Sequence, residues 1–232
     1  TVGFDRSGLA TITYPLEIAP KGAAWAEVEV GGSGEITQTP YFAPDALVGT
    51  AVDGALVSAT VGQRLGADGA VAGEPVDLPS PPVLKVVNQT VELSFPAAAP
   101  TTLGDHEVKA TVATIEVAPS FTDFAVVSDG IRVDRSTGTI NLIDRSVQPP
   151  VDRSSAEGWL VQGLPSDAPG GPATVTFDLG AVLAGLGIDA SAIDATTGVG
   201  LGVRQEYALD DATTIVGAPV LATTQWFASG SR

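Results

Sequence analysis

Hydrophobic residues alternate with polar ones along this chain instead of recurring at helical spacing. The alternation is clearest in three stretches, residues 24–30 (AWAEVEV), 89–95 (QTVELSF) and 107–117 (EVKATVATIEV). In the last of these, we expect Val108, Ala110 and Val112 to share one face. A strand with this pattern buries one face and exposes the other, as strands of antiparallel sheets do. The pattern therefore predicts antiparallel β-sheets.

Turn signals between the predicted strands support the same architecture. Asp-Gly pairs occur at residues 53–54, 68–69 and 129–130, each flanked by apolar residues. Such a pair suits a two-residue hairpin loop, because both central residues of that loop need positive φ. We expect an all-β protein made of two or three antiparallel β-sandwich-like units.

Proline-rich segments punctuate the chain at residues 75–83, 148–150 and 164–172. Proline cannot donate to a strand ladder, so these segments cannot be central strands. They predict three units: an N-terminal β unit over residues 1–78, a central sandwich-like unit over 79–148 and a C-terminal β unit over 149–232. The central unit is short for an independent seven-stranded sandwich, and it can share a core with its neighbours.

At most one short helix is expected, near residues 181–195, in the C-terminal unit. The glycines at 180, 185 and 187 disfavour a longer helix, because each costs about 1 kcal/mol in a helix interior. Asp189 can act as the N-cap of a further helical turn.

The triplet Asp-Arg-Ser occurs four times, beginning at Asp5, Asp134, Asp144 and Asp152, and an apolar residue precedes each copy. The Asp carboxylate can accept a hydrogen bond from the Ser backbone N–H two residues on, which forms an Asx turn. The copies have no fixed period, so they do not mark a solenoid repeat. We interpret the triplet as a turn that ends strands; the alternative is a recurrent site.

The composition excludes several kinds of function. The net charge is −16 and there is no basic cluster, so nucleic acid is not an expected partner. No apolar run approaches the ~18 residues of a membrane span, so no membrane insertion is expected. The chain has no cysteine and one histidine, His106, and the common nucleotide-binding and hydrolase motifs are absent. We therefore expect a protein that is not an enzyme.

A carbohydrate site is one candidate. Trp25, Glu27 and Glu29 share one face of a predicted strand, and an aromatic ring beside two acids is what a sugar site uses. Trp159 is a further candidate for stacking on a sugar ring. The alternative is an ordinary solvent-facing strand, with the tryptophans as core or interface anchors.

A cation site is a second candidate. Glu206, Asp210 and Asp211 lie close together in RQEYALDDAT and can ligate calcium through oxygen atoms, or can simply form a polar turn between strands. His106, in LGDHEV, is interpreted as a solvated loop histidine. Apart from calcium, no cofactor is expected.

The function expected from these features is structural. The absence of catalytic signatures and the Gly- and Pro-rich β units favour a virion or other assembly component, and this character is common among tailed-phage capsid decoration and tail proteins. Its partners would be copies of itself and other structural subunits, with Trp226 and Phe227 in a C-terminal docking tail. The alternative is an extracellular carbohydrate-binding or adhesion module, assisted by calcium. A virion or extracellular location is expected, with no signal peptide evident in the chain.

Overall fold

The computed structural model describes residues 2–4, 10–16, 24–30, 36–42, 55–87, 90–118, 130–147, 149–189, 191, 193, 199–217 and 220–224. The chain divides into two compact units, Thr1–Gly49 and Thr50–Arg232. Both are built from antiparallel strands, which confirms the all-β, sandwich-like fold class.

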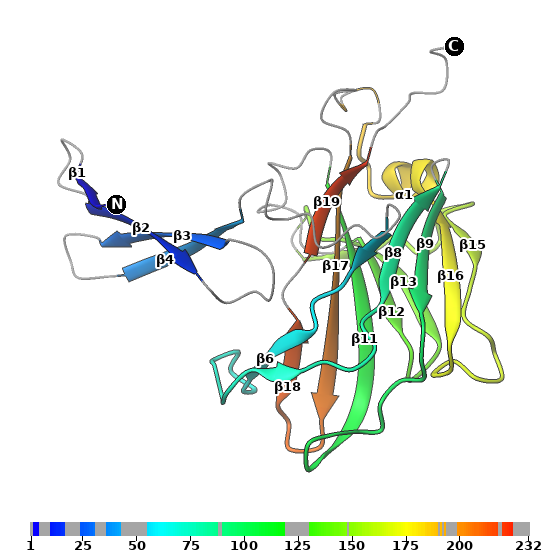
Figure 1. Ribbon diagram of the computed structural model, residues 1–232. Coiled ribbons are helices and arrows are strands. Elements are labelled where there is room, and N and C mark those ends of the chain that lie inside the picture. The colour runs from blue at the N-terminus through cyan, green and yellow to red at the C-terminus, as the bar shows by residue number, and fades with distance from the viewer. Residues whose placement is uncertain are drawn as a thin grey trace. The chain divides into compact units, whose positions relative to one another are not determined.

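The first unit is a four-stranded meander, drawn in blue in Figure 1. Its strands pair in chain order: β1 (Val2–Phe4), β2 (Ala10–Leu16), β3 (Ala24–Val30) and β4 (Ile36–Phe42). The strand predicted at residues 24–30 is confirmed as β3. It is central, because it pairs with β2 on one side and β4 on the other.

The second unit holds two sheets. In the ten-stranded sheet the order is β14 (Val151–Asp152), β13 (Thr139–Asp144), β12 (Ile131–Asp134), β11 (His106–Ala118), β17 (Val199–Leu209), β18 (Thr214–Gly217), β6 (Val61–Leu65) and β7 (Val76–Asp77). Two further strands pair with its centre, β10 (Thr102–Leu103) with β11 and β19 (Val220–Thr224) with β17. The five-stranded sheet has the order β15 (Leu160–Gln162), β16 (Ala173–Asp178), β9 (Thr90–Phe95), β8 (Val83–Val87) and β5 (Ala55–Val57).

The core lies between these two sheets. Leu93 of β9 and Phe177 of β16 belong to the same buried cluster as Ile115 of β11 and Val203 of β17. All four are essentially inaccessible to solvent. Side chains from two sheets interdigitate in this way in β-sandwiches.

The central strand β11 differs from its expected half-buried pattern. Its residues from Thr111 to Ala118 are all buried, on both faces of the sheet. A register shift between Val108 and Ala110 against β17 also moves the residues after it to the other face. Val108 therefore packs with the core side, opposite Leu209, while Ala110 and Val112 lie on the outer face. The expectation that these three residues share one face was wrong, because period-two counting cannot detect a bulge.

The one α-helix in the described part of the chain is α1, Leu179–Gly185. Asp178 is its N-cap and accepts a hydrogen bond from the Ala181 N–H at 2.8 Å, and Gly187, at φ +71°, follows its end. A Cβ on Gly185 would lie 2.7 Å from Leu142 Cδ2, so a larger residue here would require the Leu142 side chain of β13 to shift. The expected short helix is thus present, but it begins and ends earlier than residues 181–195.

The structure groups the residues differently from the three units expected from the prolines. Residues 75–83 contain β7, the last strand of the larger sheet, and lead from it to β8 of the smaller one, and residues 164–172 connect β15 to β16. Strands on both sides of residues 148–150 lie in the same sheet. The proline segments here link strands of one sandwich, and their prolines lie in the connections outside the strands, where no ladder N–H is needed.

The Asp-Arg-Ser triplets form the predicted Asx turns in all three copies that the structure describes. The carboxylates of Asp134, Asp144 and Asp152 accept the backbone N–H two residues on, at 2.9, 3.1 and 2.8 Å. Each of these Asp residues is also the last residue of its strand. The copy at Asp5 lies outside the described residues.

Two of the copies also complete the ladder of the neighbouring strand. Arg135 N–H donates to the Thr111 carbonyl and Ser136 Oγ accepts the Thr111 N–H, both at 2.9 Å. In the copy at Asp152, Arg153 N–H donates to the Leu142 carbonyl at 2.7 Å, and Ser154 Oγ accepts the Leu142 N–H at 3.0 Å. The Arg and Ser thus pair with both the N–H and the C=O of one residue in the neighbouring strand. Buried backbone groups at the end of a strand ladder need such partners.

We expect Asp144→Asn to lower the free energy of unfolding by about 1–3 kcal/mol at pH 7, because the buried carboxylate accepts hydrogen bonds from Ser146 and Arg153. The Ser146 hydroxyl is the main cause that holds the pKa of Asp144 below its usual value; burial opposes this shift and Arg153 adds to it.

The lowered pKa of Asp144 fixes the sign of the pH dependence. The charged form stabilises the fold above the unfolded-state pKa of about 3.9, and this stabilisation is lost as the pH falls through the lower folded-state pKa. Urea unfolding at pH 7 and at a series of pH values below 4 should therefore show a wild-type advantage that is full at pH 7 and shrinks as the pH falls. Asp152→Asn, in an exposed copy of the same turn, is the control and should cost less. Equal stability of Asp144→Asn and wild type at pH 7 would contradict this account.

Candidate functional site

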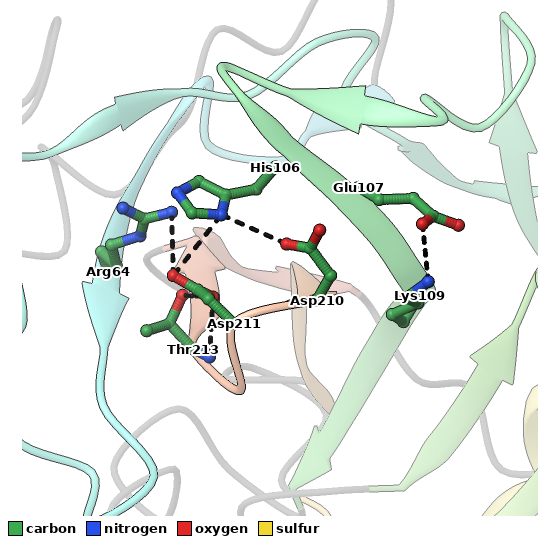
Figure 2. Close-up of polar contacts among 7 residues, drawn as sticks. All are labelled: Arg64, His106, Glu107, Lys109, Asp210, Asp211 and Thr213. Carbon is green, nitrogen blue, oxygen red and sulfur yellow. Dashed lines mark hydrogen bonds and ion pairs between the residues drawn. The ribbon is translucent and has the colours of Figure 1, made fainter.

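Among the described residues, one group of metal-ligating side chains lies where two turns meet at one end of the ten-stranded sheet. His106 begins β11 after the β10–β11 turn, and Asp210 and Asp211 lie in the β17–β18 turn. Arg64 reaches the same place from β6 (Figure 2). We call His106, Asp210 and Asp211 the His–Asp cluster. Strand pairing brings its members together from positions about a hundred residues apart in the chain.

Local backbone geometry holds the two turns in place. The β17–β18 turn closes with a 2.9 Å hydrogen bond from the Leu209 N–H to the Thr213 carbonyl, and Ala212 has φ +64°. A three-residue hairpin loop needs such a left-handed residue before the second strand. The Asp210 N–H donates to the Glu107 carbonyl at 3.1 Å, which ties this turn to the start of β11.

The imidazole lies between the two carboxylates. His106 Nδ1 is 3.2 Å from Asp210 Oδ1 and 3.5 Å from Asp211 Oδ2 (Figure 2). Asp211 Oδ2 is also 3.7 Å from Arg64 Nη2. The side chains are 32, 41 and 33% exposed for His106, Asp210 and Asp211, so water reaches the group. Ion pairs with this exposure contribute little to stability, typically about 0–1 kcal/mol.

Hydrogen bonds favour the charged form of both carboxylates. The Thr213 hydroxyl and backbone N–H, which donate to Asp211 Oδ1 at 2.6 and 3.0 Å, are the main causes that lower the pKa of Asp211. Partial desolvation raises the pKa of Asp210, but hydrogen bonds from His106 and the backbone outweigh it and leave the pKa below its usual value. Two anions therefore face His106 at neutral pH.

The cluster contains two of the three residues proposed from the sequence as a cation site. Glu206 lies within β17, opposite Val112 and Val216, and its carboxylate is 3.3 Å from Arg204 Nη2. It is not part of the group that converges, and His106 takes its place. The sequence does show that LGDHEV and RQEYALDDAT are both polar turns that border alternating strands. It does not show that β11 pairs with β17, and this pairing is what brings His106 to the two acids.

Trp159 is a core residue and not an exposed stacking surface. Its side chain is 3% exposed, its ring stacks on Phe177 with centroids 6.0 Å apart, and its Nε1–H donates to the Ser154 carbonyl at 3.1 Å. A sugar cannot stack on a face that is already covered. The proposed role of Trp159 in carbohydrate binding is therefore corrected to the alternative of a core anchor.

The other proposed carbohydrate residues lie on one strand of the first unit. The register of β3 places Trp25, Glu27 and Glu29 at alternate positions, and Pro15 of β2 and Tyr41 of β4 lie opposite Trp25. The side chains of these residues are outside the described part. Trp226 and Phe227, the proposed docking residues, also lie outside the described residues.

Apolar side chains are exposed at the β14 edge of the larger sheet and at the β15 edge of the smaller sheet. Val151 of β14 and Leu160 and Val161 of β15 are 36, 38 and 63% exposed, and Val147, in the connection that leads to β14, is 39% exposed. We call these four residues the apolar edge. β14 is the last strand of the ten-stranded sheet and β15 the last of the five-stranded sheet. Within the described ranges, no strand pairs with the outer side of either.

Comparison of the chain with protein-family models, curated proteins and solved structures finds no match. Among the described residues, no helix has the length and apolar character needed to cross a membrane.

We expect Ala212→Gly to raise the free energy of unfolding by about 1 kcal/mol, because glycine removes the strain of a Cβ at positive φ. Ala208→Gly, within β17, is the matched control and should lower it by about 0.5–1 kcal/mol. Chemical denaturation of the three proteins measures both effects. A loss of stability in Ala212→Gly would show that the turn does not have this conformation.

Proposed function

We propose that this chain is a non-enzymatic structural protein that assembles with copies of itself. The observation that carries the proposal is the apolar edge, because both sheets of the sandwich end there with short strands that expose valine and leucine. An unpaired sheet edge offers backbone N–H and C=O groups to a further strand, and exposed apolar residues beside it add buried area on association. A second copy of this chain is the occupant proposed here.

Two properties of the surface favour a symmetric contact between copies. The edge strands have only two and three residues, so each offers few hydrogen bonds, and side-chain contacts have to supply much of the affinity. Arg153 and Asp152 lie next to the exposed valine of β14, so the same edge carries both signs of charge. A two-fold contact brings the same patch together from both copies, and Asp152 of one copy can then approach Arg153 of the other, whose guanidinium is paired with Asp144 in its own copy but is 43% exposed.

The chemistry of the His–Asp cluster fits a structural protein. The imidazole faces two carboxylates, and the nearby Thr213 hydroxyl donates to Asp211 instead of facing the imidazole as a nucleophile would. The whole group is open to water, whereas general acid–base groups are usually tuned by burial.

More specifically, we propose that the protein is a virion component, such as a tailed-phage capsid decoration or tail protein, with a virion or extracellular location. The acidic all-β sandwich, its apolar edge and the absence of cysteine from the sequence support this assignment. Other structural subunits are further proposed partners, and Trp226 and Phe227 remain a proposed docking tail.

A second candidate function is an extracellular carbohydrate-binding or adhesion module, assisted by calcium. The observation that favours it is the register of the first unit, where two aromatic residues, Trp25 and Tyr41, lie opposite each other in neighbouring strands, with Glu27 and Glu29 at alternate positions beyond them. Aromatic rings with nearby acids are suited to bind sugars.

The assembly proposal predicts that Val161→Glu disrupts self-association, because it places a charge on the most exposed position of the apolar edge. We expect the dissociation constant of the assembly to rise at least about tenfold. Light scattering on a sizing column over a range of concentrations measures this, with calcium and then with chelator. Val71→Glu is the matched control, since Val71 is 70% exposed but lies beside β6, away from the apolar edge.

Two results would contradict this prediction. One is a wild-type chain that stays monomeric at every concentration, and the other is an assembly that Val161→Glu leaves unchanged. Thermal melting of the variants shows that they are folded.

The carbohydrate proposal predicts that a ligand from a broad glycan panel quenches tryptophan fluorescence and that Trp25→Ala removes the response. Because Trp159 is buried, it should contribute little to the quenching. Tyr41→Ala should weaken binding of the same ligand, and a panel without any response would count against this function. Repeating the titration with chelator tests the role of calcium.

A further inference from the structure

We propose that His106, Asp210 and Asp211 form a binding site for a divalent transition-metal ion, with Zn²⁺ as the representative ion. This site differs from the calcium site expected from the sequence in both its ligands and its metal. It is independent of the assembly proposal, because it lies on the turns of β11 and β17 and not on the apolar edge.

The spacing of the three side chains fits one shared ion. One ligand atom from each residue lies within 4.8 Å of the other two. A tetrahedral ion with Zn–N and Zn–O bonds of about 2.0–2.2 Å separates its ligand atoms by about 3.4 Å. The observed separations from His106 Nδ1 are 3.2 Å to Asp210 Oδ1 and 3.5 Å to Asp211 Oδ2. Small side-chain movements therefore suffice to place all three atoms around one metal ion.

The ligand types select the metal. An imidazole nitrogen suits Zn²⁺, Cu²⁺ and Ni²⁺, whereas Ca²⁺ takes six to eight oxygen ligands. The acid that would have completed an all-oxygen set, Glu206, is paired with Arg204. Three protein ligands leave a fourth position for water, which the partial exposure of all three side chains permits.

The surrounding contacts fix the ligands before an ion binds. Thr213 donates two hydrogen bonds to Asp211 Oδ1, which leaves Oδ2 directed at His106. The bond from the Asp210 N–H to the Glu107 carbonyl holds the two turns at a constant separation. Outer contacts of this kind orient metal ligands and usually affect metal affinity by 10–100-fold.

Within the described part of the chain, Arg64 is a cation that opposes metal binding at this site. Its guanidinium is 3.7 Å from Asp211 Oδ2 and competes with a metal ion for that oxygen. Replacement of Arg64 should therefore strengthen binding, an effect that a purely structural ion pair would not produce.

The test uses the full chain, freed of metal by chelation, and titrates Zn²⁺ while the imidazole proton resonances are followed by NMR. His106 is the only histidine, so these resonances report on this site alone. We expect a saturable shift with one equivalent of Zn²⁺ that excess Ca²⁺ does not reverse, and isothermal calorimetry should give the same stoichiometry. Absence of a shift at millimolar Zn²⁺ would overturn the proposal.

Variants separate this site from general binding to an acidic surface. By calorimetry, His106→Gln and Asp211→Asn should each weaken binding at least about tenfold, and Arg64→Gln should tighten it. Asp189→Asn is the matched control, because Asp189 accepts hydrogen bonds from the Ser191 N–H and hydroxyl at 2.8 and 2.7 Å, much as Asp211 does from Thr213. Wild-type affinity in Asp211→Asn, or equal losses in Asp189→Asn and Asp211→Asn, would overturn the proposal. Melting curves of all variants exclude unfolding as the cause.

Discussion

The pairing of β11 with β17 is the interaction on which the second unit depends. The two strands pair from Val108 and Leu209 at one end to Ala118 and Gly200 at the other. Every strand of the larger sheet connects to this pair, with β12 and β10 on β11, and β18 and β19 on β17. The inner face of the pair supplies Ile115 and Val203 to the core, and one end carries the His–Asp cluster. Loss of this pairing would remove the core and the candidate metal site together.

The same Asx turn follows three strands of the larger sheet, where buried backbone amides need hydrogen-bond partners. Two of the Asp-Arg-Ser turns, those at Asp134 and Asp152, supply such partners where a strand ends, and the copy at Asp134 makes further contacts. The Arg135 guanidinium is buried over the Phe95 ring, 4.3 Å from its centroid, and its Nη2 lies 2.8–2.9 Å from the carbonyls of Ala97, Gly170 and Gly171. A turn of the larger sheet is thereby fixed to a strand and two connections of the smaller sheet.

The candidate functional sites of the second unit lie on its surface and not in its core. The core is apolar, and most charged groups of the described residues lie outside it because removing a charge from water is costly. Among the residues whose side chains are described, the apolar edge and the His–Asp cluster are accessible, and the proposed sugar-binding residues lie on β3 of the first unit. Because these proposed sites differ in chemistry, separate experiments can test assembly, metal binding and sugar binding.

The sequence by itself determined the features that depend on near neighbours in the chain. Alternation predicted β3 and β9, and the Asp-Arg-Ser pattern predicted the turns after Asp134, Asp144 and Asp152, because an Asx turn needs only residues two apart. The acids at 210 and 211 were likewise recognisable as a polar cluster. Each of these features is set by local periodicity or by a local hydrogen bond.

Only the tertiary structure decided which distant segments meet. The bulge at Val108 changed the face of β11, the packing of Trp159 on Phe177 removed it from the surface, and the β11–β17 pairing brought His106 to Asp210 and Asp211 in place of Glu206. Strand pairing between distant segments depends on the burial of whole sheets, and the sequence pattern of a strand is the same whichever partner it takes. For this reason the strands and turns could be predicted from the sequence, whereas the candidate site could be only partly predicted.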